Sequence, residues 1–177
     1  LTITAPGAAE SLTVPSVEAA RETVERTPGG ADLVPAEEYR DGRATTVRDV
    51  LNFVPGVFAQ PKYGQEDARL AIRGSGLSRN FHLRGVRLLL DGVPINLADA
   101  SGDFHEIDPL AVRYAEVFKG ANALQFGAAS LGGAVNFVSP TGRDSPGWLL
   151  RGELGSFDAL RGQIAYGGVP GPWDWFA

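Results

Sequence analysis

Glycine and proline divide this chain into short segments, and that division limits its fold more than any other feature. Glycine supplies 23 of the 177 residues, a share of about 13%, where about 7% is usual. Because glycine permits tight turns and close approach of the backbone, the chain favours short strands and short helices joined by turns. No apolar run approaches the ~20 residues that a membrane helix needs, so a membrane role requires β-structure or a partner.

The overall composition is that of a folded domain. Hydrophobic residues make up 44% of the chain and charged residues 21%, which are ordinary globular values. The 16 basic and 21 acidic residues are spread along the chain and give a net charge of −5, so no basic stripe follows a nucleic-acid backbone. Cysteine is absent, which excludes disulfides, thiolate catalysis and Cys-type zinc sites. We expect neither a nucleic-acid partner nor a bound metal.

Two segments of the first half have helical spacing. The stripe of Val17, Ala20 and Val24 predicts a short helix that ends at Pro28. A second helix is predicted after Thr45 or Thr46, where Asp49 completes a capping box. Its apolar stripe comprises Val47, Val50, Leu51 and Val54, and Pro55-Gly56 ends it. Shorter helical turns are expected at Pro35 and at Asp108-Pro109.

Short apolar or alternating runs between these helices predict strands. The runs are 33–34, 57–59, 69–73, 86–90, 93–95, 115–118 and 134–138. Asp91-Gly92 favours a tight hairpin between 86–90 and 93–95. Strands interleaved with short helices in this way predict an α+β fold with a small mixed sheet.

The pattern changes after Pro140. Leu150 and Leu154 alternate with Arg151 and Glu153, and the stretch from Leu160 to Tyr166 repeats the alternation. A third run begins at Trp173. Alternating strands with aromatic ends are typical of a membrane barrel wall, although a soluble β-meander has the same period.

A series of motifs in the first 140 residues resembles the plug domain of TonB-dependent outer-membrane receptors. The series covers about residues 30 to 140 and consists of Thr45-Thr46-Val47-Arg48-Asp49-Val50-Leu51, Val54-Pro55-Gly56-Val57, Ile72-Arg73-Gly74, Leu90-Asp91-Gly92-Val93-Pro94, Ile107-Asp108-Pro109, Ala115-Glu116-Val117-Phe118-Lys119-Gly120, Ala123-Leu124-Gln125-Phe126-Gly127 and Leu131-Gly132-Gly133-Ala134-Val135-Asn136. Each motif alone is weak, and their shared order supplies the specificity. Within the family the chain is most similar to siderophore receptors such as those for ferric citrate, through Ala44-Thr45-Thr46 and Val54-Pro55-Gly56.

The resemblance implies a plug seated in a transmembrane antiparallel β-barrel of about 22 strands. The expected division is a mobile N-terminal segment at 1–15, the plug at 16–142 and the first barrel strands at 148–177. Leu150, Leu154, Ile164 and Tyr166 then face lipid, and Arg151, Glu153, Arg161 and Gln163 face the plug or lumen. A barrel of this size needs roughly 220 residues before loops, so we expect the chain to be a fragment of a longer receptor.

The resemblance also implies function and location. A plug of this family lies in the bacterial outer membrane, inside its own barrel, with the N-terminus in the periplasm. It gates uptake of a scarce large solute, which we expect to be a ferric siderophore or another iron chelate. The inner-membrane protein TonB, energised by ExbB and ExbD, grips an N-terminal box and pulls on the plug. The extended segment Leu1, Thr2, Ile3, Thr4 and Ala5 is expected to be the end of such a box, which adds to a sheet edge of its partner.

Two cations carry over from the family as plug–barrel contacts. They are Arg73 in Ile72-Arg73-Gly74 and Lys119 in Val117-Phe118-Lys119-Gly120. Family members pair these positions with barrel glutamates, and the second is usually arginine. Because lysine lacks the bidentate fork of arginine, we expect a weaker or wetter contact at Lys119. Without the resemblance, each residue would be interpreted as a solvated cation at a strand end.

Three polar loops, 60–68, 75–82 and 96–106, follow predicted strands and are expected at one outward end of the plug. They hold the candidate substrate-binding residues Tyr63, Gln65, Arg79, Asn80, His82, Asp99, Asp103 and His105. The acidic stretch from Asp99 to Glu106 has oxygen ligands at alternate positions, but it lacks the spacing of an EF-hand. A solvated acidic loop is the better interpretation.

We do not expect an enzyme. Neither Gly-x-Ser-x-Gly nor His-Glu-x-x-His occurs, and Gly74-Ser75-Gly76 lacks the third glycine of a dinucleotide-binding loop. No cofactor is expected, and iron enters only as part of a transported chelate. The alternative is a free-standing periplasmic module that binds a ligand or peptide without a barrel.

Overall fold

A computed structural model describes residues 14–42, 44–62, 68–75, 83 and 85–177. The chain divides into two compact units, of which one is Val17–Ser139 and the other comprises Leu1–Ser16 with Pro140–Ala177. Within the described ranges, no helix has the length and hydropathy to cross a membrane.

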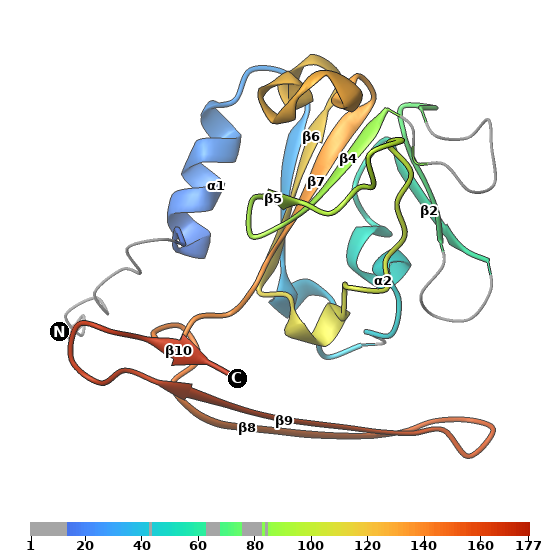
Figure 1. The fold of residues 1–177 in the computed structure, drawn as a ribbon. Helices are drawn as coiled ribbons and strands as arrows, with labels where there is room; N and C mark the ends of the chain where they lie inside the picture. The colour runs from blue at the N-terminus through green and yellow to red at the C-terminus, as the bar shows by residue number, and fades with distance from the viewer. Residues whose placement is uncertain (1–13, 43, 63–67, 76–82, 84) are drawn as a thin grey trace, which may run out of the picture. The chain divides into compact units, whose positions relative to one another are not determined.

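The first unit is built on a five-stranded sheet (Figure 1). The strands, in spatial order, are β1 (Ala31–Pro35), β6 (Tyr114–Lys119), β7 (Gly133–Val138), β4 (Val86–Leu90) and β5 (Val93–Pro94). β4 and β7 are parallel, and the other neighbours are antiparallel. The mixed sheet of the predicted α+β fold is therefore confirmed.

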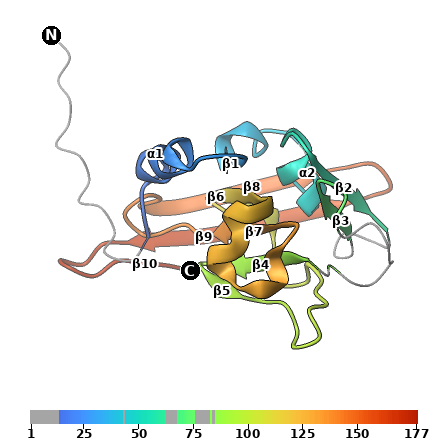
Figure 2. The same ribbon diagram turned by 90° about the horizontal axis from the view of Figure 1, so that it is seen from above.

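Short helices flank this sheet. α1 (Val17–Arg26) and α2 (Val47–Leu51) lie on opposite sides of it (Figure 2). The remaining helical turns are 3-10: η1 (Ala36–Glu38), η2 (Pro109–Ala111), η3 (Gly120–Phe126) and η4 (Ala128–Ser130). The Asp49 carboxylate accepts a hydrogen bond from the Thr46 backbone N–H at 2.8 Å, so the predicted capping box begins α2 at Thr46.

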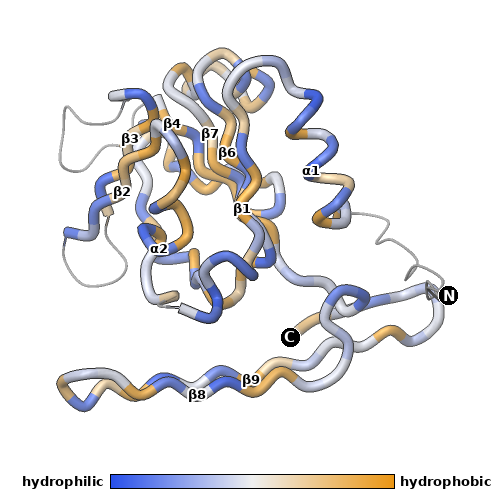
Figure 3. Tube along the Cα trace, turned by 180° about the vertical axis from the view of Figure 1, so that it is seen from behind, coloured by the Kyte–Doolittle hydropathy of each residue, from blue (hydrophilic) through white to orange (hydrophobic). Residues whose placement is uncertain are grey.

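The main core fills the space between the sheet and α2. Val50 and Leu51 of α2 pack there with Val117 and Val135 of the sheet, all at most 2% exposed. A separate hairpin of β2 (Val57–Pro61) and β3 (Ala68–Ile72) adds Leu70 and Ile72 to this core. Apolar positions accordingly follow the sheet strands in Figure 3. This burial holds the ends of β3, β6 and β7 in fixed positions.

The second unit is a hairpin with two unlike faces. β8 (Gly147–Leu154) pairs with β9 (Leu160–Gly168), and β9 pairs with β10 (Trp175–Phe176). The register places Leu150 opposite Ile164 and Arg151 opposite Gln163. Leu150 and Ile164 are 72% and 73% exposed. The predicted separation of apolar and polar faces is therefore confirmed, while the run from Trp173 forms a strand only at Trp175–Phe176.

Candidate functional site

The candidate site lies where β1, β6 and the turn after β3 meet, and its centre is an ion pair. The Nζ atom of Lys119 is 2.5 Å from Oδ2 of Asp32, and the two side chains are 7% and 29% exposed. Antiparallel pairing sets Asp32 opposite Val117, so Lys119, two residues further on, lies on the same face of the sheet. The pair thus joins the edge strand β1 to β6.

Arg73 lies over the same end of these strands. It occupies the first of two left-handed positions, φ +52° at Arg73 and +85° at Gly74, in a tight turn that Ile72 and Ser75 close with two backbone hydrogen bonds. A Cβ atom on Gly30 would lie 2.5 Å from Nη2 of Arg73, and one on Gly120 would lie 3.3 Å from Nη1. Because glycine has no Cβ atom, Gly30 and Gly120 leave room for the guanidinium of Arg73.

The structure therefore brings together the two predicted plug–barrel contacts. Gly30 lies within 3.3 Å of Lys119 side-chain carbons as well as of Arg73, measured from its ideal Cβ position. Arg73 and Lys119 are cations and Asp32 is a single carboxylate, so this end of β1 and β6 carries a surplus positive charge. Lys119 has a carboxylate partner inside the plug, whereas Arg73 is exposed. Their contacts with a barrel stay predictions.

A close approach of backbones holds the Arg73 turn against the sheet. A Cβ atom on Gly132 would lie 2.2 Å from Cβ of Ser75 and 2.9 Å from the Gly85 carbonyl oxygen. The Gly132 N–H donates to that same carbonyl at 2.7 Å. Only glycine permits this spacing, so Gly132 fixes the position of the turn that carries Arg73.

Three of the predicted substrate-binding residues lie in the described part of the chain. Oδ1 of Asp99 accepts hydrogen bonds from the Ser101 N–H at 3.0 Å and from its hydroxyl at 2.5 Å. Oδ1 of Asp103 is 2.9 Å from Nδ1 of His105, with side chains 46% and 57% exposed. Slight burial raises the pKa of Asp103, but hydrogen bonds from His105 outweigh it and hold that pKa below 3.8.

The other predicted site residues fall outside the described ranges. They are Leu1, Thr2, Ile3, Thr4 and Ala5 of the expected box and the loop residues Tyr63, Gln65, Arg79, Asn80 and His82. Among the residues that the structure describes, no three His, Asp or Glu side chains gather into a metal site.

Two of the three polar loops start at opposite ends of the β2–β3 hairpin, which differs from the predicted arrangement. In the β2–β3 hairpin Pro61 is opposite Ala68, and Val57 is opposite Ile72. The loop between Pro61 and Ala68 therefore starts at one end of the hairpin, and the segment after Ser75 starts at the other. Strand register is the reason, because an antiparallel hairpin returns the chain to its starting end.

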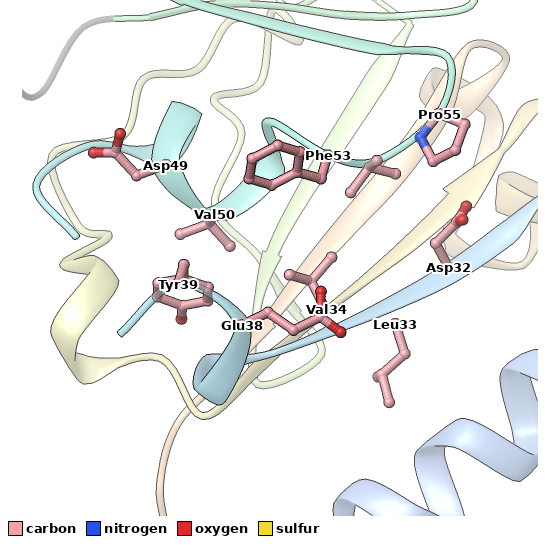
Figure 4. A pocket seen from close by; sticks show the side chains of 10 residues that line it. Asp32, Leu33, Val34, Glu38, Tyr39, Asp49, Val50, Phe53 and Pro55 are labelled. Carbon is pink, nitrogen blue, oxygen red and sulfur yellow. The ribbon is translucent and has the colours of Figure 1, made fainter. Parts of the chain in front are cut away.

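A pocket that the sequence did not predict lies between β1 and α2 (Figure 4). Its volume is about 160 Å³. The lining residues are Asp32, Leu33, Val34, Glu38, Tyr39, Asp49, Val50, Phe53, Val54 and Pro55. Asp49 caps α2 and Asp32 pairs with Lys119, so two of its three carboxylates are already engaged. Phe53, 83% exposed, had no sequence signal beyond its place after the helical stripe.

Glu116 is a second feature that sequence reasoning missed. It faces Asn136 across β6 and β7, and its Oε2 accepts a hydrogen bond from Nδ2 of Asn136 at 2.8 Å. Burial raises the pKa of Glu116 above 4.5, and the Asn136 hydrogen bond opposes that rise. Oδ1 of Asn136 also accepts from the Gly92 N–H at 2.9 Å. This network ties the tight turn after β4 to the middle of the sheet.

Comparison with known proteins identifies the fold. The TonB-dependent Receptor Plug Domain family matches residues 23–134. The chain is similar to the ferric yersiniabactin uptake receptor FyuA from Yersinia pestis, with a TM-score of 0.59 and 21% identity over 82% of this chain and 22% of that one. It is also similar to the ferric-catecholate import receptor Fiu from E. coli K12, with a TM-score of 0.57 and 22% identity over 80% of this chain and 19% of that one.

A third similar structure is the siderophore receptor PirA from Acinetobacter baumannii, with a TM-score of 0.53 and 19% identity over 82% of this chain and 22% of that one. The chain thus spans about a fifth of the length of each of these receptors. At identities this low, the structural similarity shows a shared fold and nothing more. The predicted resemblance is confirmed, while the narrower likeness to ferric-citrate receptors stays a prediction. Because the family match covers more than half of its residues, the chain belongs to the TonB-dependent receptor plug domain family.

Proposed function

We propose that this chain is the plug and first barrel segment of a TonB-dependent outer-membrane transporter that gates uptake of a ferric siderophore. The observation that carries the proposal is the plug-family match over residues 23–134. The similar structures named above are receptors for ferric yersiniabactin, ferric catecholates and siderophores. They favour an iron chelate over cobalamin, a nickel complex or an oligosaccharide as the cargo.

The hairpin of β8 and β9 supports a barrel. Its apolar face pairs Trp148 with Tyr166, Leu150 with Ile164 and Leu154 with Leu160, and Leu154 and Leu160 are 87% and 78% exposed. A soluble module would bury such a face, whereas a barrel wall presents it to lipid. Outer-membrane lipid and the remaining barrel strands are the partners that this face requires.

Gating then depends on a pull from the periplasmic side. TonB, energised by ExbB and ExbD, grips the N-terminal box, for which Leu1–Ala5 are the candidates. β1 is an edge strand and the first strand after α1, so the pull reaches it before the rest of the sheet. The Asp32–Lys119 pair opposes its release, because separation leaves a buried lysine without a carboxylate.

The proposed cycle makes and breaks no covalent bond, so the protein is a transporter without a resident cofactor. Iron is part of the cargo. Asp99, Asp103 and His105, with the five loop residues Tyr63, Gln65, Arg79, Asn80 and His82, are the candidates for cargo binding. Basic groups among them suit an anionic ferric chelate.

A binding assay with the purified full-length receptor tests the choice of cargo. We expect micromolar or tighter quenching of tryptophan fluorescence by a ferric catecholate, hydroxamate or mixed siderophore, and no quenching by cobalamin at the same concentration. Binding of cobalamin alone would contradict the iron assignment. A full-length protein without further alternating strands would instead favour the free-standing periplasmic module.

A further inference from the structure

Strand β5 is only two residues long, yet hydrogen bonding along the edge of β4 continues beyond it. The Ile95 N–H donates to the Leu88 carbonyl at 3.0 Å. In a regular antiparallel ladder, Leu88 would donate back to the Ile95 carbonyl. The next bond would then run from the Leu97 N–H to the Val86 carbonyl. Instead the Leu97 N–H donates to the Ser101 carbonyl at 2.8 Å, so the chain turns away from the sheet.

The Asn96 side chain takes over the two missing bonds. Its Oδ1 accepts from the Leu88 N–H at 2.7 Å, and its Nδ2 donates to the Val86 carbonyl at 3.2 Å. An amide side chain offers the same kinds of donor and acceptor as a peptide group. Asn96 therefore continues the ladder while its own backbone leaves the sheet. Val86 and Leu88 are at most 1% exposed, so loss of the amide would cost two buried backbone groups their partners.

The loop that follows, 97–106, folds back onto this amide. A Cβ atom on Gly102 would lie 3.2 Å from Nδ2 of Asn96 and 3.5 Å from Cδ1 of Leu83. Glycine thus lets the loop backbone lie directly on the amide. Near the far end of the loop, Phe104 is 2% exposed and belongs to the main core. The loop therefore has two fixed points, Asn96 before it and Phe104 within it.

The described candidates for cargo binding lie on this loop. Asp99 follows the amide by three residues, and Asp103 and His105 flank Phe104. All three side chains are exposed. Because the backbone between them is held at two points, these side chains are presented in one arrangement, which lowers the entropic cost of binding a ligand.

We propose that Asn96 is the positioning residue of the loop 97–106, and that its amide holds Asp99, Asp103 and His105 in the arrangement that meets the cargo. This inference rests on the proposed function, which makes these three side chains candidates for cargo binding. Loss of the amide should release the start of the loop and leave the sheet folded, because β4 is also paired with β7 along its other edge.

Hydrogen exchange of the purified full-length receptor, followed by mass spectrometry of peptides, tests the positioning directly. We expect Asn96→Ala to speed exchange in peptides that cover 97–106 at least about tenfold, since exchange follows the population of the locally opened loop. Peptides that cover β6 should exchange as in the wild type. Asn52→Ala is the matched control, because Asn52 is also an asparagine outside the strands but is exposed, and it should change neither region.

Binding is measured on the same variants by quenching of tryptophan fluorescence. The probes are a ferric catecholate, a ferric hydroxamate and a mixed ferric siderophore. For the probe that binds the wild type, Asn96→Ala should weaken the dissociation constant at least about fivefold, and Asn52→Ala should leave it unchanged. If Asn96→Ala yields no folded receptor, Asn96→Asp replaces it. That variant keeps the shape and the acceptor, but its carboxylate cannot donate to the Val86 carbonyl, so it should also speed exchange in 97–106.

Three results would overturn the role of Asn96. The first is exchange in 97–106 that is the same for the Asn96 variant and Asn52→Ala. The second is an equal rise in 97–106 and in β6, which would mean that Asn96 only stabilises the plug as a whole. The third is faster exchange confined to 97–106 with unchanged siderophore binding. Failure of the wild type to bind any of the three probes, with the local rise in exchange still present, would contradict the proposed function alone.

Discussion

Lys119 and Asp32 form an ion pair of 2.5 Å inside the plug, across the boundary between the edge strand β1 and β6. The family resemblance implied a barrel glutamate as the partner of Lys119. The internal carboxylate explains how a lysine that is only 7% exposed is tolerated in this unit. Detachment of β1 from β6 would separate this ion pair, and it therefore has an electrostatic cost.

Removal of the Asp32 charge should therefore destabilise the plug. We expect Asp32→Asn to lower the free energy of unfolding by about 3 kcal/mol, because it leaves Lys119 buried without a counter-charge. Urea unfolding of the chain, followed by circular dichroism, measures the loss. The double variant Asp32→Asn with Lys119→Met should recover most of it.

The control for this prediction is an exposed ion pair. Nη2 of Arg26 lies 3.1 Å from Oε2 of Glu22, with side chains 80% and 65% exposed. Glu22→Gln should change the free energy of unfolding by less than about 0.5 kcal/mol. Equal losses for Asp32→Asn and Glu22→Gln would show that burial does not increase the contribution of the Asp32–Lys119 pair to the free energy of unfolding.

Gly132→Ala should disturb the Arg73 turn. The added Cβ would overlap that of Ser75 at 2.2 Å, and we expect a loss of about 1–3 kcal/mol in the free energy of unfolding. Gly152→Ala is the control, because its Cβ meets nothing within 4 Å. Ser75→Gly should partly rescue Gly132→Ala in the same urea assay. No rescue would mean that the Gly85 carbonyl is the dominant clash.

Glu116 should make plug stability depend on pH. Its pKa in the folded state is above its ordinary 4.5, so the folded state binds the proton more tightly than the unfolded state does. The resulting stabilisation is full below pH 4.5 and is lost as pH rises through the folded-state pKa. Relative to wild type, Glu116→Gln should gain stability over that rise, by about 1.4 kcal/mol per unit of pKa difference. Unfolding midpoints of both proteins that run parallel from pH 4 to 7 would contradict this.

The two faces of the hairpin should respond oppositely to charge. Leu150→Glu places a carboxylate on the apolar face and should reduce the fraction of full-length receptor that assembles in outer membranes, by an energy on the order of 2 kcal/mol at mid-membrane depth. Gln163→Glu, on the polar face opposite Arg151, should assemble normally. Heat-modifiable mobility separates folded from unfolded receptor. Equal assembly of the two variants would argue against lipid contact.

Local sequence patterns predicted much of the fold. The helix start at Thr46 followed from Asp49 three residues later, and period-two alternation gave the faces of β8 and β9. Both signals lie within a few residues of the structure they specify. The plug fold itself came from motif order, which no single segment contains.

Long-range relationships escaped such patterns. Asp32 and Lys119 meet because β1 pairs with β6, and no local signal reports that pairing. β1 runs from Ala31 to Pro35 although only Leu33-Val34 suggested a strand. The left-handed turn at Arg73 was missed because its first position lacks the Asn, Asp or Gly typical of such turns. The pocket beside Phe53 depends on the same tertiary packing.

Uptake of radiolabelled iron by cells that produce the full-length receptor tests the central claim most directly. The account predicts accumulation from a ferric siderophore that requires TonB and is lost when Leu1–Ala5 are deleted, while binding at the cell surface persists. Accumulation at the same rate without TonB, or with the N-terminal segment deleted, would contradict it.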